Sequence, residues 1–401
     1  MKNHFLLLFT ATFFNHTCKG FFNDYHSKKS VGDRECLGEK LNPNKEAIPI
    51  EKEVFGEING TPIHQFTIIN KNNVKAKVIE FGAILTSLEV PDSSGTIADL
   101  THGFETLDGW VESNSHYFGA TIGRFGNRIA HGQFSIGDSS YEIPTNNDPG
   151  GIPCSLHGGE KGFNNVIWRG SILNDQTVEF LYNSKDGEEG FPDNLKVKVT
   201  YTLNEENELI WEATATTDAP TIVNMVHHSY WNLSGNPKQP ILDHILKLNA
   251  SSYLPTNKGL IPTGDISPVG GTPMDFTEPQ IIGERINDDF EPLKLGAGYD
   301  HCWVLNDNDE GKVQFAAHVK DPISGRTMKV FTNQPGIQFY TSNFLDGSIT
   351  GKNNVSYQKR TAFCLETQRF PDSPNQPNFP SCLLVPGETY KHTLVHKFSW
   401  D

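Results

Sequence analysis

The feature that most constrains the fold is a strict two-residue alternation of apolar and polar side chains. It runs from Lys196 to Leu203 and continues from Glu208 to Thr216 after a turn-like Asn-Glu-Glu-Asn. Alternation of this period places one face of a strand in a core and the other in solvent, so the two runs predict a β-hairpin. Further strand-like runs cover 75–90, 177–182, 244–248, 313–319, 328–332 and 390–398.

Turn sequences separate these runs, and no long amphipathic helical pattern competes with them. Residues 92–95 (Asp-Ser-Ser-Gly) and 321–325 (Asp-Pro-Ile-Ser-Gly) are typical turns. Strands do not alternate with helices, and neither GxGxxG nor GxxxxGK[ST] occurs, which argues against a nucleotide-binding parallel sheet. We therefore predict an all-β chain folded as a large antiparallel β-sandwich.

Charge limits the class of partner. The 401 residues carry a formal net charge of -15, and no run of clustered Lys or Arg offsets it along the sequence. Such a chain repels phosphate backbones, so we expect no nucleic-acid partner.

The N-terminal region differs from the rest. Lys2 precedes an apolar stretch from Phe5 to Phe14 that resembles a secretory signal peptide, and residues 21–50 are polar without a hydrophobic period. We predict a signal-like segment at 1–20, a flexible leader at 21–50 and a β-sandwich domain at 51–401. The protein is then expected to be secreted, without stable membrane insertion after signal removal. If the segment is not a functional signal, the expected location is cytoplasmic.

Entry into the secretory pathway would make two sequence features relevant. Five Asn-x-Ser/Thr sequons are potential glycosylation sites: Asn15, Asn59, Asn232, Asn249 and Asn354. We expect Asn232 to be too enclosed to carry a glycan. Six cysteines are present, and those outside the N-terminal region are scattered singly, at Cys154, Cys302, Cys364 and Cys382. Isolated buried thiols are the expected state, with a disulfide as the alternative.

Two glycine-rich turns present polar side chains. Gly-Arg-Phe-Gly-Asn-Arg-Ile at 123–129 offers Asn127 and Arg128 to a ligand, although an arginine beside turns can equally form a surface ion pair. Ser-Leu-His-Gly-Gly at 155–159 places His157 before a double-glycine turn, where a structural role is an equal alternative.

Two strand-like segments contain buried titratable groups. His227 and His228 are adjacent, so on a strand they point to opposite faces and only one of them faces a given pocket. No carboxylate or cysteine at a suitable spacing completes a metal set around them. Glu366 lies within the apolar Phe-Cys-Leu-Glu-Thr-Gln at 363–368, where a glutamate has a raised pKa and suits acid–base chemistry near neutrality. The alternative is a structural pair with an arginine.

These motifs, with Tyr-Asp-His at 299–301 and Gly-Ile-Gln-Phe-Tyr at 336–340, resemble the aldose 1-epimerase (galactose mutarotase) family over about residues 55–398. The most specific matches are Asn-Phe-Leu-Asp-Gly at 343–347 and the stretch FCLETQRFPDSPNQPNF at 363–379. The resemblance implies a galactose-mutarotase-like antiparallel β-sandwich. It also implies an isomerase that interconverts the α and β anomers of free aldohexoses without a cofactor or a metal.

The resemblance further implies roles for individual residues. Glu366 would be the general base and His228 the general acid, while His157 would assist near the ring oxygen. The sugar hydroxyls would be held by Asn127, Arg128, Asp300 and Gln338. Candidates for an aromatic platform under the sugar are Tyr230, Phe125, Trp231 and Phe339, most of which we expect in the core.

One segment departs from the family pattern. Residues 357–361 read Tyr-Gln-Lys-Arg-Thr, where many members have a Lys-His-Ser or Lys-His-Gly sequence, and Arg360 would suit an anionic sugar. Two alternatives therefore stand beside the main prediction. One is a hexose-6-phosphate 1-epimerase, and the other is a non-catalytic sugar-binding protein on the same fold.

Overall fold

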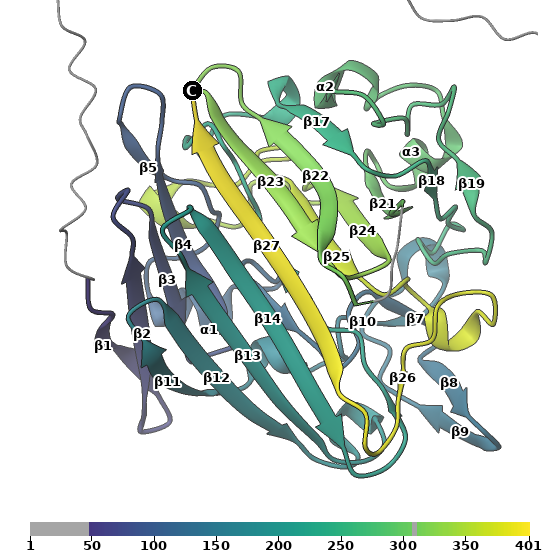
Figure 1. Ribbon diagram of the computed structural model, residues 1–401. Coiled ribbons are helices and arrows are strands. Elements are labelled where there is room, and N and C mark those ends of the chain that lie inside the picture. The colour runs from purple at the N-terminus through teal and green to yellow at the C-terminus, as the bar shows by residue number, and fades with distance from the viewer. Residues whose placement is uncertain (1–47, 307–310) are drawn as a thin grey trace, which may run out of the picture. The chain divides into compact units, whose positions relative to one another are not determined.

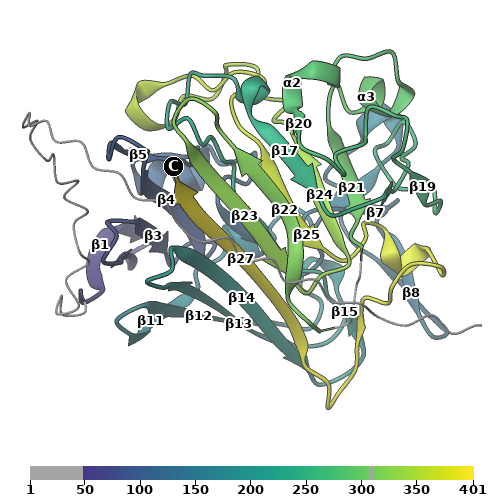
Figure 2. The same cartoon turned by 45° about the horizontal axis from the view of Figure 1, so that its top comes forward.

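The computed structural model describes residues 48–306 and 311–401, so the predicted signal and leader lie outside the described residues, apart from 48–50. Its largest element is a nine-stranded antiparallel sheet, with β27 between β14 and β23 (Figures 1 and 2). In sheet order the strands are β11 (Arg169–Asn174), β12 (Thr177–Ser184), β13 (Leu195–Leu203), β14 (Glu208–Thr217), β27 (Tyr390–Trp400), β23 (Arg326–Thr332), β22 (Gln314–Lys320), β17 (Ile245–Leu248) and β20 (Gln280–Ile281).

Two five-stranded antiparallel sheets complete the main framework. The first has the order β1 (Glu51–Ile58), β2 (Thr61–Ile69), β3 (Lys75–Ile79), β4 (Ile84–Pro91) and β5 (Ile97–Asp99). The second has the order β19 (Ser267–Pro268), β18 (Ser252–Tyr253), β21 (Asp300–Val304), β24 (Gly336–Tyr340) and β25 (Cys364–Gln368).

Short elements connect these sheets. Four two-stranded pairs are β6 (Ala120–Ile122) with β16 (Val226–His228), β7 (Arg128–Ala130) with β10 (Cys154–Leu156), β8 (Gln133–Ile136) with β9 (Ser139–Glu142), and β15 (Thr221–Ile222) with β26 (Leu383–Leu384). The α-helices of the described part are α1 (Leu107–Glu112), α2 (Ile282–Arg285) and α3 (Glu291–Leu295). None of the described helices is long and apolar enough to span a membrane.

The predicted hairpin is confirmed as β13 and β14. Leu203 pairs with Leu209, and the side chains of β13 alternate regularly between buried and more exposed along its length. The run at 75–90 was predicted as one strand-like stretch, but it forms two antiparallel strands, β3 and β4. A turn with Gly82 at φ +64° separates them, and a Cβ there would lie 2.5 Å from the carbonyl oxygen of Asn164, so only glycine fits.

One large core holds the three sheets together, as a sandwich requires. It includes Phe66 and Leu88 from the first five-stranded sheet, Tyr201 and Trp211 from the nine-stranded sheet, and Phe339 from the second five-stranded sheet. The all-β prediction is therefore confirmed. The nine-stranded sheet presents one face to this core, and its other face carries the polar side chains of each alternating pattern.

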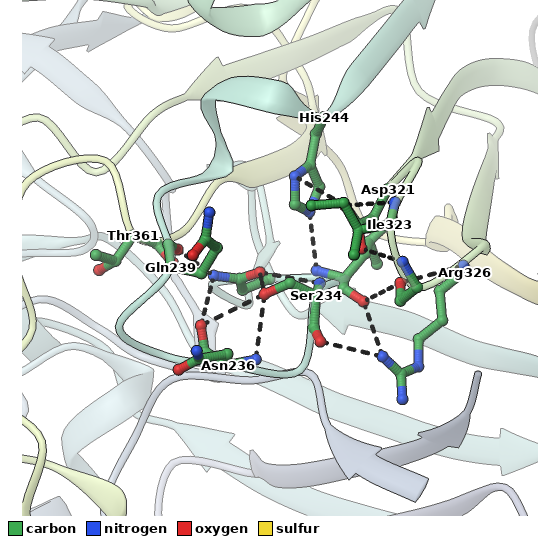
Figure 3. A network of polar contacts seen from close by, with 11 residues as sticks. Ser234, Asn236, Gln239, His244, Asp321, Ile323, Arg326 and Thr361 are labelled. Carbon is green, nitrogen blue, oxygen red and sulfur yellow. Dashed lines mark hydrogen bonds and ion pairs between the residues drawn. The ribbon is translucent and has the colours of Figure 1, made fainter. Parts of the chain in front are cut away.

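A polar network fixes the chain directly after β16 (Figure 3). The buried amide nitrogen of Asn232 donates to the carbonyls of Asn236, Gln239 and Thr361 at 2.8–3.2 Å. The buried guanidinium of Arg326 donates to the carbonyls of Leu233 and Ser234, each at 3.2 Å. Because these bonds satisfy the buried side chains of Asn232 and Arg326, they hold in place the chain that follows β16, the strand that carries His228.

Candidate active site

A cavity of about 300 Å³ lies where several strand ends meet. This volume is at the lower end of the range for small-molecule sites, so it suits a single sugar ring. The strands β7, β16, β21, β24 and β25 contribute to its wall, together with the turn after β10. All the residues that the sequence indicated as catalytic or sugar-holding line it, namely Asn127, Arg128, His157, His228, Tyr230, Asp300, Gln338 and Glu366.

Three adjacent strands of one sheet place Asp300, Gln338 and Glu366 on one face. Gln338 pairs with Glu366 across β24 and β25, and the Gln338 amide donates to the Asp300 carboxylate at 2.7 Å. The Gln338 side-chain oxygen in turn accepts from Gln368 at 3.3 Å. These bonds fix the Gln338 amide before any ligand arrives. The second carboxylate oxygen of Glu366, Oε2, is buried and has no hydrogen-bond partner among the described residues.

His228, at the end of β16, lies next to Glu366 on the cavity wall. Its Nε2 lies 3.5 Å from the Glu366 Oε1, and both side chains are almost fully buried. The Cys364 Sγ lies 3.7 Å from the other ring nitrogen, Nδ1. When Nδ1–H donates to the Cys364 sulfur, Nε2 is unprotonated and can accept a proton from the Glu366 carboxyl group. As expected for a strand, the neighbouring His227 points away, against the rings of Trp211 and His396 in the core.

Reciprocal hydrogen bonds join the two glycine-rich turns and position His157. The backbone N–H of Asn127 donates to the His157 Nδ1 at 3.2 Å, and the backbone N–H of His157 donates to the Asn127 carbonyl at 3.1 Å. A neutral imidazole that accepts at Nδ1 carries its proton on Nε2, so His157 presents a hydrogen-bond donor. A Cβ at Gly158 would lie 1.9 Å from the Gly123 carbonyl oxygen, which explains the glycine after the histidine.

Burial dominates the electrostatics of the site. It raises the pKa of Glu366 well above its ordinary value, with a further increase from Asp300 and an opposing decrease from Arg128. It also lowers the pKa of His228 to about 3 and that of His157 well below 6.5. The pKa of Asp300 is raised by burial, against the opposing effects of Arg128 and Gln338. Both members of the His228–Glu366 pair therefore favour their neutral forms.

The donor atoms of His157, His228 and Glu366 lie within 4.8 Å of one another, a set found in catalytic zinc sites. A histidine that binds a metal normally donates its other ring N–H to an acceptor. His157 does the opposite, because its Nδ1 accepts the N–H of Asn127 and the proton stays on Nε2. The tautomer of His157 therefore fits a hydrogen-bond donor better than a metal ligand.

Some of the cavity wall was not foreseen from the sequence. Tyr117, Asn147, Tyr340 and Phe344 also line it. Tyr117 packs against the rings of His157 and His228, with centroid distances of 4.6 and 5.9 Å. It lies in an irregular segment after α1, where no local pattern signals function, whereas Tyr340 belongs to the Gly-Ile-Gln-Phe-Tyr motif. Of the proposed platform residues only Tyr230 lines the cavity, while Phe125, Trp231 and Phe339 are core side chains.

The described cysteines are Cys154, Cys302, Cys364 and Cys382, all buried free thiols. The prediction of isolated thiols is confirmed for these four. Cys18 and Cys36 lie outside the described residues.

Comparison with known proteins agrees with the motifs. Residues 64–397 match the aldose 1-epimerase family. The chain belongs to that family. It is 43% identical to the galactose mutarotase of Mus musculus over 354 residues, which cover 88% of this chain and 99% of the mouse protein. The aldose 1-epimerase of Escherichia coli K12 is 34% identical over 342 residues, or 85% and 96% of the two chains.

A solved structure gives the same fold. The crystal structure of an aldose epimerase homologue from C. elegans superimposes with a TM-score of 0.75 at 29% identity, covering 83% of this chain and 98% of that one. The predicted galactose-mutarotase-like sandwich is therefore confirmed.

In this aldose 1-epimerase the divergent segment 357–361 lies outside the cavity wall. Arg360 donates to the Ala297 carbonyl at 3.3 Å and does not line the cavity. Tyr357 is buried, and its hydroxyl donates to the Gly103 carbonyl at 2.8 Å. Among the described lining residues, Arg128 alone is an arginine or lysine. The segment thus supplies no basic rim for a sugar phosphate.

Proposed function

We propose that this aldose 1-epimerase interconverts the α and β anomers of free aldohexoses, galactose and glucose among them, with Glu366 and His228 as its proton-transfer pair. The observation that carries the proposal is the 3.5 Å approach of His228 Nε2 to Glu366 Oε1 inside a buried cavity. Anomerisation needs one proton removed from the O1 hydroxyl and one delivered to the ring oxygen. Two groups next to each other on the cavity wall supply both transfers.

The reaction proceeds by ring opening. Glu366 takes the O1 proton as His228 donates to the ring oxygen, and the C1–O5 bond breaks to give the open-chain aldehyde. Rotation about C1–C2 turns the other face of the carbonyl toward O5. Ring closure then reverses both transfers, with Glu366 returning a proton to O1 and His228 removing one from O5, so the enzyme ends in its starting protonation state.

The pair contains the right number of protons for this chemistry. Glutamic acid beside neutral imidazole and carboxylate beside imidazolium hold the same number of protons, so one transfer between Oε1 and Nε2 interconverts them. Burial favours the neutral pair, whereas Arg128 favours the carboxylate. Hydrogen bonds from sugar hydroxyls stabilise the charged form further, so substrate binding favours the reactive pair.

The remaining polar residues hold the sugar. The Nε2–H of His157 donates toward the ring oxygen or an adjacent hydroxyl. Asn127, Arg128, Asp300 and Gln338 bind hydroxyl groups, and Tyr230, stacked on the His228 ring at 5.2 Å, offers an apolar face to the pyranose. Because Gln338 and Asp300 already bond to each other, their orientation costs little on binding.

Polarimetry tests the proposal. Freshly dissolved α-D-galactose and α-D-glucose should reach equilibrium rotation faster with enzyme than in buffer, and the corresponding 6-phosphates should respond less because the cavity wall has a single arginine. If the protein binds galactose, as shown by calorimetry, but leaves the rate at its buffer value, the non-catalytic sugar-binding alternative replaces the proposal. A 6-phosphate that reacts faster than the free sugar would support the phosphate-specific alternative.

We also propose that the protein is secreted, with residues 1–20 as its signal. The pattern of Lys2 followed by the apolar stretch 5–14 supports this. Asn59 and Asn354 are exposed sequons available to glycosylation, whereas the Asn232 amide is buried and fully engaged. Intact-mass analysis of protein from the culture medium should show loss of the N-terminal segment and no glycan at Asn232. Full-length protein confined to the cytosol would contradict the assignment.

A further inference from the structure

The face of the nine-stranded sheet turned away from the sugar cavity has a hollow of about 490 Å³. No other helix or strand lies in front of β12, β13 and β14 in Figure 1. Cationic, hydroxyl and amide side chains line the hollow, among them Arg169, Lys196, Lys198, Asn183, Thr214 and Thr216.

Strand register explains how these cations gather. Arg169 on β11 is opposite Leu181 on β12, Leu181 is opposite Lys198 on β13, and Lys198 is opposite Thr214 on β14. Arg169 and Lys198 are thus two strands apart, about 10 Å at the usual strand spacing. Lys196 lies two residues from Lys198 on the same face of β13, about 7 Å along the strand.

Acidic residues lie near the hollow, Glu179 on the same face of β12 and Asp218 near Lys196, but neither forms an ion pair with its cations. Arg169, Lys196 and Lys198 are exposed, and none forms an ion pair within the described part of the chain. None of the described lining residues is an Asp or Glu. Lysines nearby on the same face differ, since Lys391 pairs with Glu212 at 3.1 Å and Lys397 pairs with Glu208 at 3.0 Å. A chain of net charge -15 thus keeps three unpaired cations together on one sheet.

We propose that this hollow binds a linear polysaccharide bearing carboxylate or sulfate groups. Three unpaired cations would contact anionic groups along the polymer, and the hydroxyls of Thr214 and Thr216 and the amide of Asn183 would hydrogen-bond to sugar hydroxyls between them. The site lies on the far face of the sheet, so a bound polymer leaves the entrance of the sugar cavity open.

Spacing and shape favour a polysaccharide over other polyanions. Duplex DNA carries one charge per about 1.7 Å of its axis, far denser than cations about 10 Å apart, and the overall charge of the protein repels it. A lipid bilayer is flat on this scale, whereas these cations line a concave surface. A sugar polymer with one acidic group every second residue presents sparse charges separated by hydroxyls, which is the pattern on the sheet.

The test uses the full-length protein and immobilised heparin and hyaluronate, with neutral dextran as the uncharged control. We expect binding to an acidic polysaccharide that weakens as salt increases, and no binding to dextran. Lys196→Gln with Lys198→Gln should weaken binding about tenfold, because two ionic contacts are lost. The matched control is Lys320→Gln with Lys329→Gln, which removes the same charge from unpaired lysines elsewhere on this face and should change binding less than about twofold.

Several outcomes would overturn the proposal. Equal weakening by the two double variants would show diffuse attraction without a site. Displacement of the polymer by galactose would place it in the sugar cavity. Tighter binding to a DNA duplex, to polyglutamate or to phosphatidylserine vesicles would assign the hollow to another partner, and absence of binding at 50 mM salt would remove the site altogether. Unchanged mutarotation by both double variants is expected and shows that the variants are folded.

Discussion

The two sides of β16 and β25 make an instructive comparison. Toward the cavity the strands present His228 and Glu366, and toward the core they present His227 and Thr367. Both sides are buried and both contain histidine. The core side adds His392, which bonds to the Thr367 hydroxyl at 2.7 Å, and His396, whose ring nitrogens have no partner among the described residues.

The difference between the sides lies in space and in charge partners. On the cavity side a carboxylate and an imidazole lie 3.5 Å apart on the wall of a volume that accepts a sugar. On the core side, rings of Trp211 and Trp231 fill the space around the histidines, and no carboxylate pairs with them in the described residues. Burial lowers the pKa of His228 and of His392 to about 3 alike. A shifted pKa alone therefore does not distinguish a catalytic histidine from a structural one.

The largest expected effect is on the cavity side of β25. Glu366→Gln keeps the shape of the side chain but removes the base, so kcat should fall about 10³-fold. The matched control is Thr367→Val, one residue along the strand and facing the core, which should cost stability through the lost His392 bond but leave kcat within about threefold. Polarimetry with α-D-galactose measures both. A similar loss of kcat in the two variants would contradict the assignment of catalysis to the cavity side alone.

A smaller effect is expected at His157. We interpret it as a hydrogen-bond donor to the sugar and not as a proton-transfer group, so His157→Asn should lower kcat/KM by about 10- to 100-fold. The measurement is the initial rate of mutarotation over a range of galactose concentrations. A loss as large as that of Glu366→Gln would instead place His157 within the proton-transfer step.

The buried histidines of the core side should make the free energy of unfolding depend on pH. The folded-state pKa of His396 is lowered by burial to about 3, below its ordinary value of 6.5. The unfolded chain therefore binds a proton that the folded one excludes, so stability is retained above pH 6.5 and lost as the pH falls below it. Each such histidine contributes about 1.4 kcal/mol per pH unit.

His396→Leu isolates this contribution. Between pH 7.5 and pH 5.5 the free energy of unfolding of the variant should decrease by about 1.4 kcal/mol less than that of the wild type, because one titrating core group is gone. Urea unfolding at the two pH values measures the difference. An identical decrease in both proteins would show that His396 is accessible to protons in the folded state.

The smallest expected effect concerns metals. The His157 tautomer fits a hydrogen-bond donor, so prolonged treatment with EDTA should leave kcat unchanged. Elemental analysis of the purified enzyme and polarimetry before and after chelation provide the measurement. Loss of activity that zinc restores would assign the cluster of His157, His228 and Glu366 to a metal and reject the acid–base account.

The sequence predicted those parts of the fold and site that local patterns determine. Alternation identified the hairpin of β13 and β14. Short sequence motifs indicated the catalytic and sugar-binding residues, and all of them line the cavity. It did not predict the break between β3 and β4, because both strands have strand-like patterns and the turn between them depends on the close approach of Gly82 to Asn164. Tyr117 and the cationic hollow were missed for a related reason. Tertiary packing brings Tyr117 against His157 and His228, and strand register brings together the cations of the hollow from separate strands.

The most direct test of the account compares two neighbouring histidines. Mutarotation of α-D-galactose is followed by polarimetry with His228→Asn and, separately, with His227→Asn, after circular dichroism has shown that both variants are folded. The account predicts that kcat falls about 10³-fold for His228→Asn and stays within about threefold of the wild type for His227→Asn. Retained activity in His228→Asn, or an equal loss in both variants, would contradict it.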